Sequence, residues 1–422
     1  MTSAPSTAPA APPARIAFLI DGSENYGVLQ MMSLILETVD QRPFRMVGIF
    51  LGRGPARDQL AALCDEVIDL GMGCLLPLSR AGYSKYNVPN MVRKSLLFVR
   101  AVIAATAALR RAHIDLVHVH MYPLHLVAGL ACRLRPTACV WHWHSSFDRH
   151  RKFHMIARLA FGPLATCVVC ISRFVAGTLP ESGQRKARVV YNAVKYHELR
   201  ARQRPGQLRA LLAIPPARPL VSIVGSLTEY KGHEYFVRAA AAVLRDFPDT
   251  YFAIIGREMD VQRHRFGREA RLRRLVADLG ITARILFFGH LDDSALYMCD
   301  CDIVCVPTIP LGIGGEGFGL VLTEAMTAGV AVVATSCGAP PEIIEDGVSG
   351  LLVPPRDSDE LARAMVFLLS SEERRKAIGA AGQQRVIDRF DSSRMAREVA
   401  ALYQECLAHT HGRRSGDRTT SS

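Results

Sequence analysis

The second half of the chain contains a glycine-rich loop that leads into a helix, Glu316-Gly317-Phe318-Gly319-Leu320-Val321-Leu322-Thr323-Glu324. The two glycines predict a loop, and Leu320 to Ala328 predict the helix that follows. The first N–H groups of a helix have no partner within it, and they lie at the positive end of the helix dipole. The stretch therefore predicts an anion site beneath the loop, with carboxylates beside it.

The two glutamates of this stretch suggest which anion could bind. A diphosphate would suit the free N–H groups, while Glu316 and Glu324 could accept hydrogen bonds from hydroxyl groups on either side. A diphosphate joined to hydroxyl-rich groups suggests a nucleotide-sugar. The alternative is that Glu316 is a solvated loop residue and Glu324 a surface charge, but the neighbours of Glu324 are too apolar for a freely solvated face.

Short β-rich runs alternate with helical patterns on both sides of this stretch, which predicts doubly wound parallel sheets. The first series of predicted strands is Arg15–Ile20, Phe44–Leu51, Glu66–Leu70, Ile114–His120, Ala138–Trp143, Ala165–Ile171 and Arg188–Tyr191. The second series is Leu220–Gly225, Thr250–Gly256, Ala283–Gly289, Cys301–Pro307 and Val330–Thr335. We therefore expect an α/β protein with two Rossmann-like domains.

Length and composition support two domains. A chain of 422 residues is longer than a domain with a single hydrophobic core usually is, and 49% hydrophobic residues can fill two cores. The expected boundaries are a disordered tail at 1–14, a first domain at 15–195, a linker at 196–218, a second domain at 219–387, a C-terminal helix at 388–410 and a second tail at 411–422. The 11 cysteines form no regular framework, which predicts reduced thiols and the cytoplasm. The sequence predicts neither a signal peptide nor a membrane-spanning helix.

The net charge of +12 needs an explanation. Basic residues decorate two apolar helical patterns in the first half, one around Arg93 to Arg111 and the other from His150 to Phe161. Such helices can lie on an anionic membrane, and they can equally be packed helices with solvated basic faces, so both interpretations stay open. Nucleic acid is not expected as a partner, because the basic residues are not interleaved with stacking aromatic residues.

The order of the motifs in the second half resembles glycosyltransferase family four. These motifs are Gly225-Ser226-Leu227-Thr228-Glu229-Tyr230-Lys231-Gly232, Phe287-Phe288-Gly289-His290, Cys301-Asp302-Ile303-Val304-Cys305-Val306-Pro307, the glutamate stretch, Gly338-Ala339-Pro340-Pro341-Glu342 and Asp346-Gly347-Val348-Ser349-Gly350. Their order and spacing are more specific than any one of them. The resemblance implies a retaining transferase that uses a nucleotide-sugar, with a GT-B fold of two domains facing across a cleft and a C-terminal helix that packs back on the first domain.

The resemblance also implies roles for individual residues. Lys231 would bind the donor phosphates, Glu316 the sugar hydroxyls and Glu324 the ribose, while His144 would contact the sugar from the first domain; Lys231, Glu316 and His144 form the expected catalytic set. The rest of the expected donor site is Gly225, Arg257, Gly317, Phe318, Gly319 and Leu320. The chain departs from the family at Ser226, where an arginine is common, and Arg257 is a candidate replacement.

The first domain supplies the expected acceptor side. Gly22 and Gly27 flank the loop after the first strand, where relatives usually have paired glycines, and Asn192 follows a later strand. His118 and His120 end another strand, and a cleft position and a structural role both stay open for them. Carboxylate or cysteine partners at metal-ligand spacing are not evident, so neither a metal nor another cofactor is expected.

The expected reaction is transfer of a sugar from a UDP- or GDP-linked donor to a hydroxyl of a glycan or lipid-linked acceptor, with retained anomeric configuration. Cell-envelope or exopolysaccharide assembly at the inner face of the membrane is the expected setting, by analogy. Two alternatives stay open. One is an epimerase or hydrolase of nucleotide-sugars with the same fold, and the other is a non-catalytic subunit that binds them.

Overall fold

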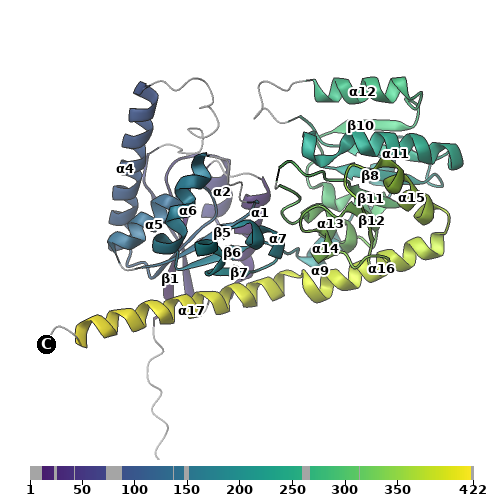
Figure 1. Ribbon diagram of the computed structural model, residues 1–422. Coiled ribbons are helices and arrows are strands. Elements are labelled where there is room, and N and C mark those ends of the chain that lie inside the picture. Colours follow the sequence, from purple (N-terminus) through teal and green to yellow (C-terminus); the bar gives the residue numbers. More distant parts are fainter. Residues whose placement is uncertain are drawn as a thin grey trace, which may run out of the picture. The chain divides into compact units, whose positions relative to one another are not determined.

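The computed structural model describes residues 12–22, 26–41, 43–72, 88–135, 137–146, 152–258, 267–312 and 314–419 (Figure 1). Of the predicted tails and loops, residues 1–11, 23–25 and 420–422 lie outside this part. The expected linker at 196–218 contains two short helices, and the last helix runs to Thr419.

The first sheet has seven strands in the order β3-β2-β1-β4-β5-β6-β7. Its strands are β1 (Ala14–Ile20), β2 (Phe44–Phe50), β3 (Glu66–Asp69), β4 (Leu116–Val119), β5 (Ala138–Trp143), β6 (Cys167–Cys170) and β7 (Ala187–Val189). β1 pairs in parallel with both β2 and β4, so the strand order reverses at β1. Every predicted strand of this series is confirmed.

The second sheet has six strands in the order β10-β9-β8-β11-β12-β13. These are β8 (Leu220–Val224), β9 (Tyr251–Ile255), β10 (Ile285–Gly289), β11 (Ile303–Val306), β12 (Ala331–Thr335) and β13 (Leu351–Val353). The pairs β8·β9 and β8·β11 are both parallel, so this sheet reverses at β8. Five of the six strands were predicted, and β13 was missed. The fold class, two Rossmann-like parallel-sheet domains, is confirmed.

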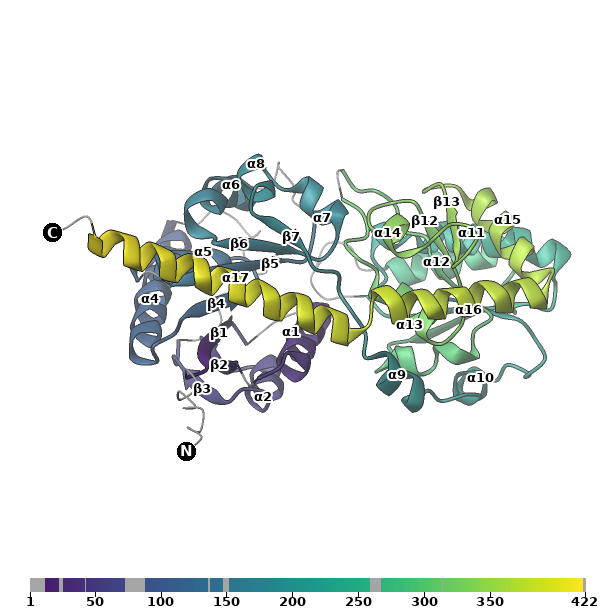
Figure 2. The ribbon, with the colours of Figure 1, turned by 90° about the horizontal axis from the view of Figure 1, so that it is seen from below.

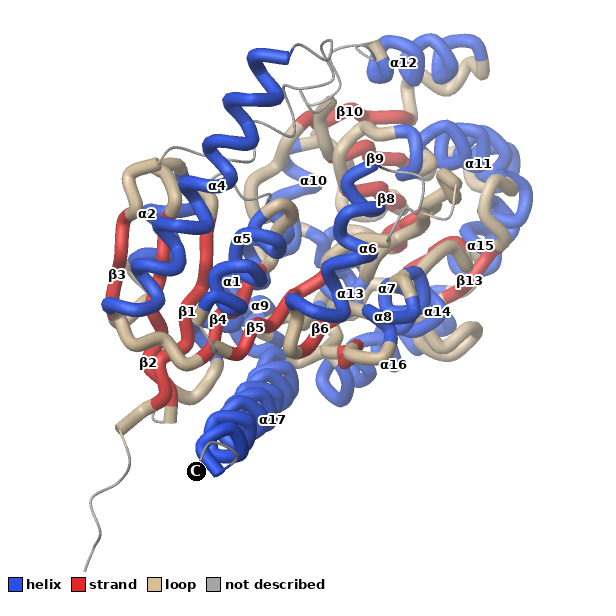
Figure 3. Tube along the Cα trace, turned by 60° about the vertical axis from the view of Figure 1, so that its left-hand side comes forward, coloured by secondary structure: helices blue, strands red, loops and turns tan. Residues whose placement is uncertain are grey.

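Helices connect the strands, and Figure 3 shows them in blue around the red strands. They are α1 (Tyr26–Thr38), α2 (Pro55–Ala61), α4 (Val88–Arg111), α5 (Leu124–Leu134), α6 (Lys152–Leu164), α7 (Arg173–Thr178), α8 (Glu181–Gln184), α9 (Tyr196–Arg202), α10 (Gln207–Leu211), α11 (His233–Asp246), α12 (Arg268–Asp278), α13 (Leu320–Thr327), α14 (Pro340–Ile343), α15 (Ser358–Leu369), α16 (Glu372–Arg389) and α17 (Ser392–Thr419). Three short 3-10 turns are η1 (Glu229–Lys231), η2 (Ser294–Leu296) and η3 (Met298–Asp300).

Internal contacts divide the chain into two compact units. Unit 1 contains residues 1–142, 159–169 and 396–422, and unit 2 contains residues 143–158 and 170–395. Figure 2 shows the helices and strands of both from a second direction. In unit 2, apolar side chains from one face of the second sheet and from the helices that cover it form a buried core, with Phe236 of α11 packed edge-on against Phe252 of β9 at a ring-centroid distance of 5.9 Å.

A helix that crosses a bilayer needs about 20 consecutive, mostly apolar residues. Within the described part of the chain, every helix is too short or too polar for this.

Candidate functional site

The candidate site of unit 2 lies where the strand order of the second sheet reverses. β8 leads through Gly225 to Lys231 in η1, and the neighbouring strand β11 leads to Thr308. Because parallel strands end at the same edge, both side chains come to the carboxyl edge of the sheet. Ligands of open α/β sheets bind at such a reversal, so this edge is the first place to look for chemistry.

Glu316 joins these two strand ends. Its Oε2 accepts hydrogen bonds from Lys231 Nζ at 2.7 Å and from Thr308 Oγ1 at 3.0 Å. Only 8% of Glu316 is exposed, which excludes the interpretation of a solvated loop residue. The sequence predicted both Lys231 and Glu316 as site residues, and the structure brings them into direct contact.

Lys231 is held as a cation at this position. Burial works to lower the pKa of its ammonium group, but the charge of Glu316 and interactions with Tyr230 outweigh burial and raise the pKa above its usual value. The ammonium nitrogen also lies 5.1 Å from the centroid of the Tyr230 ring, within the range of a cation–π interaction. Lys231 therefore carries its charge throughout the physiological pH range.

The glycines around Lys231 let the chain pass close to itself. Gly232 has φ +74°, and a Cβ there would lie 1.8 Å from the carbonyl oxygen of Pro307. Gly256 has φ +150°, and a Cβ there would lie 1.9 Å from the carbonyl oxygen of Gly225. Neither position has room for a side chain, so η1 packs directly onto the end of β11.

The loop that carries Glu316 is fixed by its backbone. The N–H of Glu316 donates to Cys337 O at 3.1 Å, and Glu316 O accepts from the N–H of Ala339 at 2.8 Å. Gly338 has φ +93°, and a Cβ there would lie 2.3 Å from Glu316 O. The motif at 338–342 therefore holds the glutamate loop in place.

The glycines after Glu316 approach the end of β5 and the turn before α7. Ser172 Oγ donates to Gly317 O at 2.7 Å. A Cβ on Gly317 would lie 3.1 Å from the backbone oxygen of the half-buried His144. The structure thus brings the backbone of His144, which was expected to contact the sugar, next to the glutamate loop.

The predicted helix is α13, and it begins after Gly319 at φ +94°. No N-cap side chain accepts from the first N–H groups of α13, because the N-cap residue is Gly319, and Phe318 just before it is 98% buried against Tyr191 and Phe390. Glu324 lies in the body of α13 with only 8% of its surface exposed. It is therefore not an ordinary surface charge.

The remaining predicted residues of unit 2 are more scattered. The exposed Arg257 follows β9, and its backbone oxygen accepts from Leu227 N at 3.1 Å, one residue beyond Ser226. Arg257, the candidate replacement for the arginine that the resemblance would place at Ser226, is thus anchored next to that position. Asn192 is buried after β7.

The predicted acceptor glycines belong to unit 1. Gly22 has φ +95° directly after β1, and a Cβ there would lie 2.8 Å from Gly52 O. Gly27 is exposed in the first turn of α1. The residues between them, 23–25, lie outside the described part of the chain.

Several polar residues of the site were not predicted. Thr308 bonds the Glu316 carboxylate, and Thr335 Oγ1 donates to Thr308 O at 2.5 Å. Glu342 accepts from the N–H groups of Arg173 and Phe174, at 2.8 and 2.7 Å, and from Tyr191 Oη at 3.0 Å. Both threonines lie at the carboxyl ends of predicted strands, and this position could have identified them as site residues.

His233 follows this site as the first residue of α11. Burial, together with the charges of Lys231 and Arg268, lowers the pKa of its imidazole to about 3, although a backbone hydrogen bond at Thr228 opposes the shift. His233 is only 2% exposed. It is therefore neutral in the folded protein at any pH at which the protein would act.

A pH dependence of stability follows from this shift. An unfolded histidine binds a proton below about pH 6.5 whereas folded His233 does not, so its contribution is complete above that pH and is lost as the pH falls towards 3. At pH 5 the loss is about 2 kcal/mol. We expect His233→Asn to reduce by this amount the fall in unfolding free energy between pH 7.5 and 5, measured by denaturant titration. An equal fall in both proteins would contradict the shift.

Two family models match the chain. The model described as Glycosyltransferase Family 4 matches residues 59–198, and the model described as Glycosyl transferases group 1 matches residues 207–385. The second match includes Lys231, Glu316 and Glu324 of the site.

Individual glycosyltransferases are also similar to this chain in sequence or in structure. A phosphatidyl-myo-inositol mannosyltransferase of Mycobacterium leprae is 37% identical over 176 residues, which are 41% of this chain and 43% of that protein, so the match spans less than half of the relative. A glycosyltransferase structure from Rickettsia africae superposes with a TM-score of 0.77 at 20% identity, covering 94% of this chain and 99% of that one. The structure of Anabaena HepE, solved in complex with UDP, superposes with a TM-score of 0.75 at 21% identity. It covers 93% of this chain and 100% of that one. At such identities the two structures establish the fold alone. The chain therefore belongs to glycosyltransferase family four, and its two parallel-sheet domains have the GT-B fold.

Proposed function

We propose that the protein is a retaining glycosyltransferase. It moves a hexosyl group from a UDP- or GDP-linked sugar to a hydroxyl of a glycan or lipid-linked acceptor, in cell-envelope or exopolysaccharide synthesis at the inner face of the membrane. The observation that carries the proposal is the mostly buried pair of Lys231 and Glu316 at the carboxyl ends of β8 and β11, followed by the glycine-capped helix α13.

The pair suggests how a donor could bind. Without a ligand, Glu316 neutralises Lys231 at 2.7 Å. A diphosphate brings two negative charges and can take over the ammonium group, which frees the Glu316 carboxylate to accept hydrogen bonds from sugar hydroxyls. The first N–H groups of α13 would receive further phosphate oxygens.

In the chemical step, the main contribution of the protein is the positive charge of Lys231. The bond from the anomeric carbon to the diphosphate oxygen breaks, and the acceptor oxygen forms its bond on the same face of the sugar. The proton of the acceptor hydroxyl passes to the departing phosphate. Lys231 stabilises the negative charge that develops on that phosphate, which is electrostatic stabilisation of the transition state.

The relatives support the substrate classes. The name of the Mycobacterium leprae protein gives a phosphatidyl-myo-inositol as its acceptor, which is a lipid that carries sugar-like hydroxyl groups. The Anabaena structure holds UDP. A nucleoside-diphosphate donor and a lipid-linked acceptor are therefore the substrates to test first.

Calorimetry with a panel of UDP-, GDP- and ADP-sugars tests this function. We expect one nucleotide class to bind and its sugar to appear, with retained configuration, on an added acceptor. Release of a free or epimerised sugar without acceptor would instead favour a hydrolase or epimerase. Absence of binding by every donor would favour a non-catalytic role and would point to Ser226 as the disabling difference.

The role of Glu324 can be tested separately. If its carboxylate binds the ribose, Glu324→Gln weakens binding of the free nucleoside diphosphate, by roughly tenfold for one charged hydrogen bond. Glu324→Gln preserves the size of the side chain in its buried position. Unchanged affinity for the nucleotide would rule out the ribose role.

The proposal includes contact with a membrane surface, and the exposed side chains of α4 support this contact. Its side chains Val92, Leu96, Val99 and Ile103 are 53–62% exposed. Their spacing of four, three and four residues puts them on one stripe of the helix. Over the second half of the helix the opposite face is buried, at Ala101, Ala105 and Ala108, and α4 packs against α5. Arg93 and Arg100 are exposed beside the stripe, so the helix combines apolar and cationic groups as a helix lying on anionic lipid does.

Vesicle binding tests this surface. We expect the double variant Leu96→Glu/Ile103→Glu to bind vesicles containing anionic lipid at least about tenfold more weakly, because each substitution removes an apolar side chain and adds a repelled charge. Leu211→Glu is the matched control, since Leu211 is 55% exposed on α10 of unit 2. Equal vesicle binding by both variants would show that the stripe is an ordinary solvated surface.

A further inference from the structure

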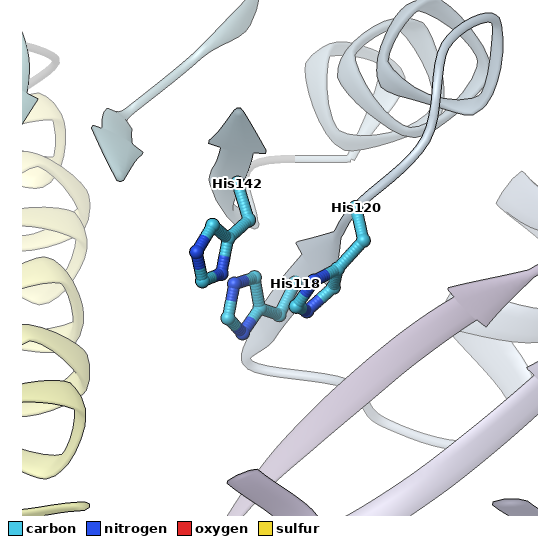
Figure 4. A group of neighbouring side chains, drawn as sticks. All are labelled: His118, His120 and His142. Carbon is cyan, nitrogen blue, oxygen red and sulfur yellow. The ribbon is translucent and has the colours of Figure 1, made fainter. Parts of the chain in front are cut away.

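Unit 1 contains a cluster of three buried imidazoles that the proposed reaction does not use (Figure 4). His118 lies in β4, His120 directly follows that strand, and His142 lies in β5. The three residues are 0%, 3% and 1% exposed. Each offers a ring nitrogen, and these atoms all lie within 4.8 Å of one another.

The strand register explains why they meet. His118 pairs with Val140 of β5, so His142, two residues further on, is on the same face as His118. His120 is two residues beyond His118 and continues that face. The rings pack with centroid distances of 4.4 to 5.3 Å, and His118 and His142 are stacked at an interplanar angle of 1°.

A fourth side chain orients the cluster. His118 Nδ1 and Tyr403 Oη are hydrogen-bonded at 2.7 Å, and Tyr403, on α17, is fully buried. If Nδ1–H donates this bond, the lone pair of His118 is on Nε2. Histidines that bind metals commonly donate their other ring N–H to an oxygen in this way, which fixes the ring and its tautomer.

We propose that His118, His120 and His142 bind a zinc ion. Three neutral imidazoles suit zinc, with water or hydroxide as the fourth ligand, whereas magnesium and calcium require oxygen ligands that this trio does not supply. Bound water that ionises to hydroxide also reduces the charge buried with the ion. Zinc–nitrogen bonds of about 2.1 Å require ring nitrogens roughly 3.4 Å apart, so the rings need only close by modest side-chain rotations.

The sequence did not predict this site, because carboxylate or cysteine partners of the histidines at metal-ligand spacing are not evident along the chain. The third ligand is instead an imidazole on the neighbouring strand. A zinc ion here would tie β4 to β5, and through His118 it would strengthen the contact with Tyr403.

Metal analysis of the full chain tests the proposal. The protein is treated with a chelator, given one equivalent of zinc chloride and passed through a desalting column. We expect the wild-type protein to retain one zinc per chain and to melt at a higher temperature with zinc than without it. We expect cobalt(II) in place of zinc to give the intense visible absorption of a tetrahedral site. Absence of retained zinc and of this absorption in the wild-type protein overturns the proposal without any variant.

Variants locate the ion. We expect His120→Asn and His142→Asn to lose the retained zinc, and Tyr403→Phe to keep it with an affinity lower by roughly ten- to a hundredfold. His113→Asn is the matched control in unit 1, because His113 is exposed and has a φ of +49°, a conformation that asparagine adopts readily. Retention of zinc by both ligand variants, or its loss from His113→Asn, overturns the assignment to the buried trio.

Discussion

Replacing Lys231 with methionine is expected to lower the rate of sugar transfer about a hundred- to a thousandfold, the usual effect of removing one group that stabilises developing charge. Methionine keeps the unbranched apolar stem but not the ammonium group. The raised pKa of Lys231 means that the wild-type residue is charged at every working pH, so the loss should not depend on pH. Initial rates with the donor identified by calorimetry measure the effect.

Stability has to be separated from catalysis in this experiment. Lys231→Met leaves the mostly buried Glu316 carboxylate without its cation, and removal of one partner of a buried pair costs about 3–5 kcal/mol. The double variant Lys231→Met/Glu316→Gln removes both charges and should recover most of the unfolding free energy. Because the double variant lacks both groups of the site, its transfer rate should stay low.

A lysine elsewhere provides the matched control. Lys376 pairs with Glu372 at 2.6 Å on α16, where the two side chains are 77% and 66% exposed. Lys376→Met should leave the transfer rate unchanged and hardly alter the unfolding free energy, because solvent screens an exposed ion pair. A Lys231→Met protein that is folded and transfers sugar at the wild-type rate would refute the phosphate role of Lys231.

Much of the fold was predictable because parallel strands have a clear sequence signature. Strands buried on both faces are short apolar runs bounded by glycine or polar residues, as in β4, β6, β8, β11 and β12, whereas the edge or near-edge strands β3, β7 and β10 are less buried. The three-residue β13, Leu351–Val353, was missed because it is too short to show a period and directly follows a turn motif. Its pairing with β12 is a tertiary contact, which no local pattern contains.

The candidate site was predictable only in part. The sequence indicated Lys231 and Glu316, 85 positions apart, as separate members of one site, and the structure adds their hydrogen bond. Thr308 escaped notice because a threonine after a strand is common, and only its distance to Glu316 gives it a role. The histidine trio depended on the register of β4 against β5, which the sequence does not reveal.

Gly232→Ala is expected to lower the unfolding free energy by roughly 2–4 kcal/mol. Two causes add up at this position. A residue other than glycine at φ +74° is strained by about 1 kcal/mol, and its Cβ would lie 1.8 Å from Pro307 O. A contact this short requires a backbone shift, since the carbonyl cannot rotate away as a side chain would, and overpacking of this kind costs about 1–3 kcal/mol.

Gly280→Ala separates these two causes. Gly280 also belongs to unit 2 and has φ +69°, but a Cβ there meets nothing within 4 Å. We expect Gly280→Ala to lose only the conformational part, about 1 kcal/mol, and the difference between the two variants in denaturant titrations then measures the contact with Pro307. That contact holds η1 against the end of β11, so Gly232→Ala should also move Lys231 away from Thr308 and Glu316 and weaken donor binding, whereas Gly280→Ala should not. Equal losses of stability in the two variants would mean that backbone strain alone reserves position 232 for glycine, and that the lysine is positioned by its bond to Glu316 rather than by the packing beneath it.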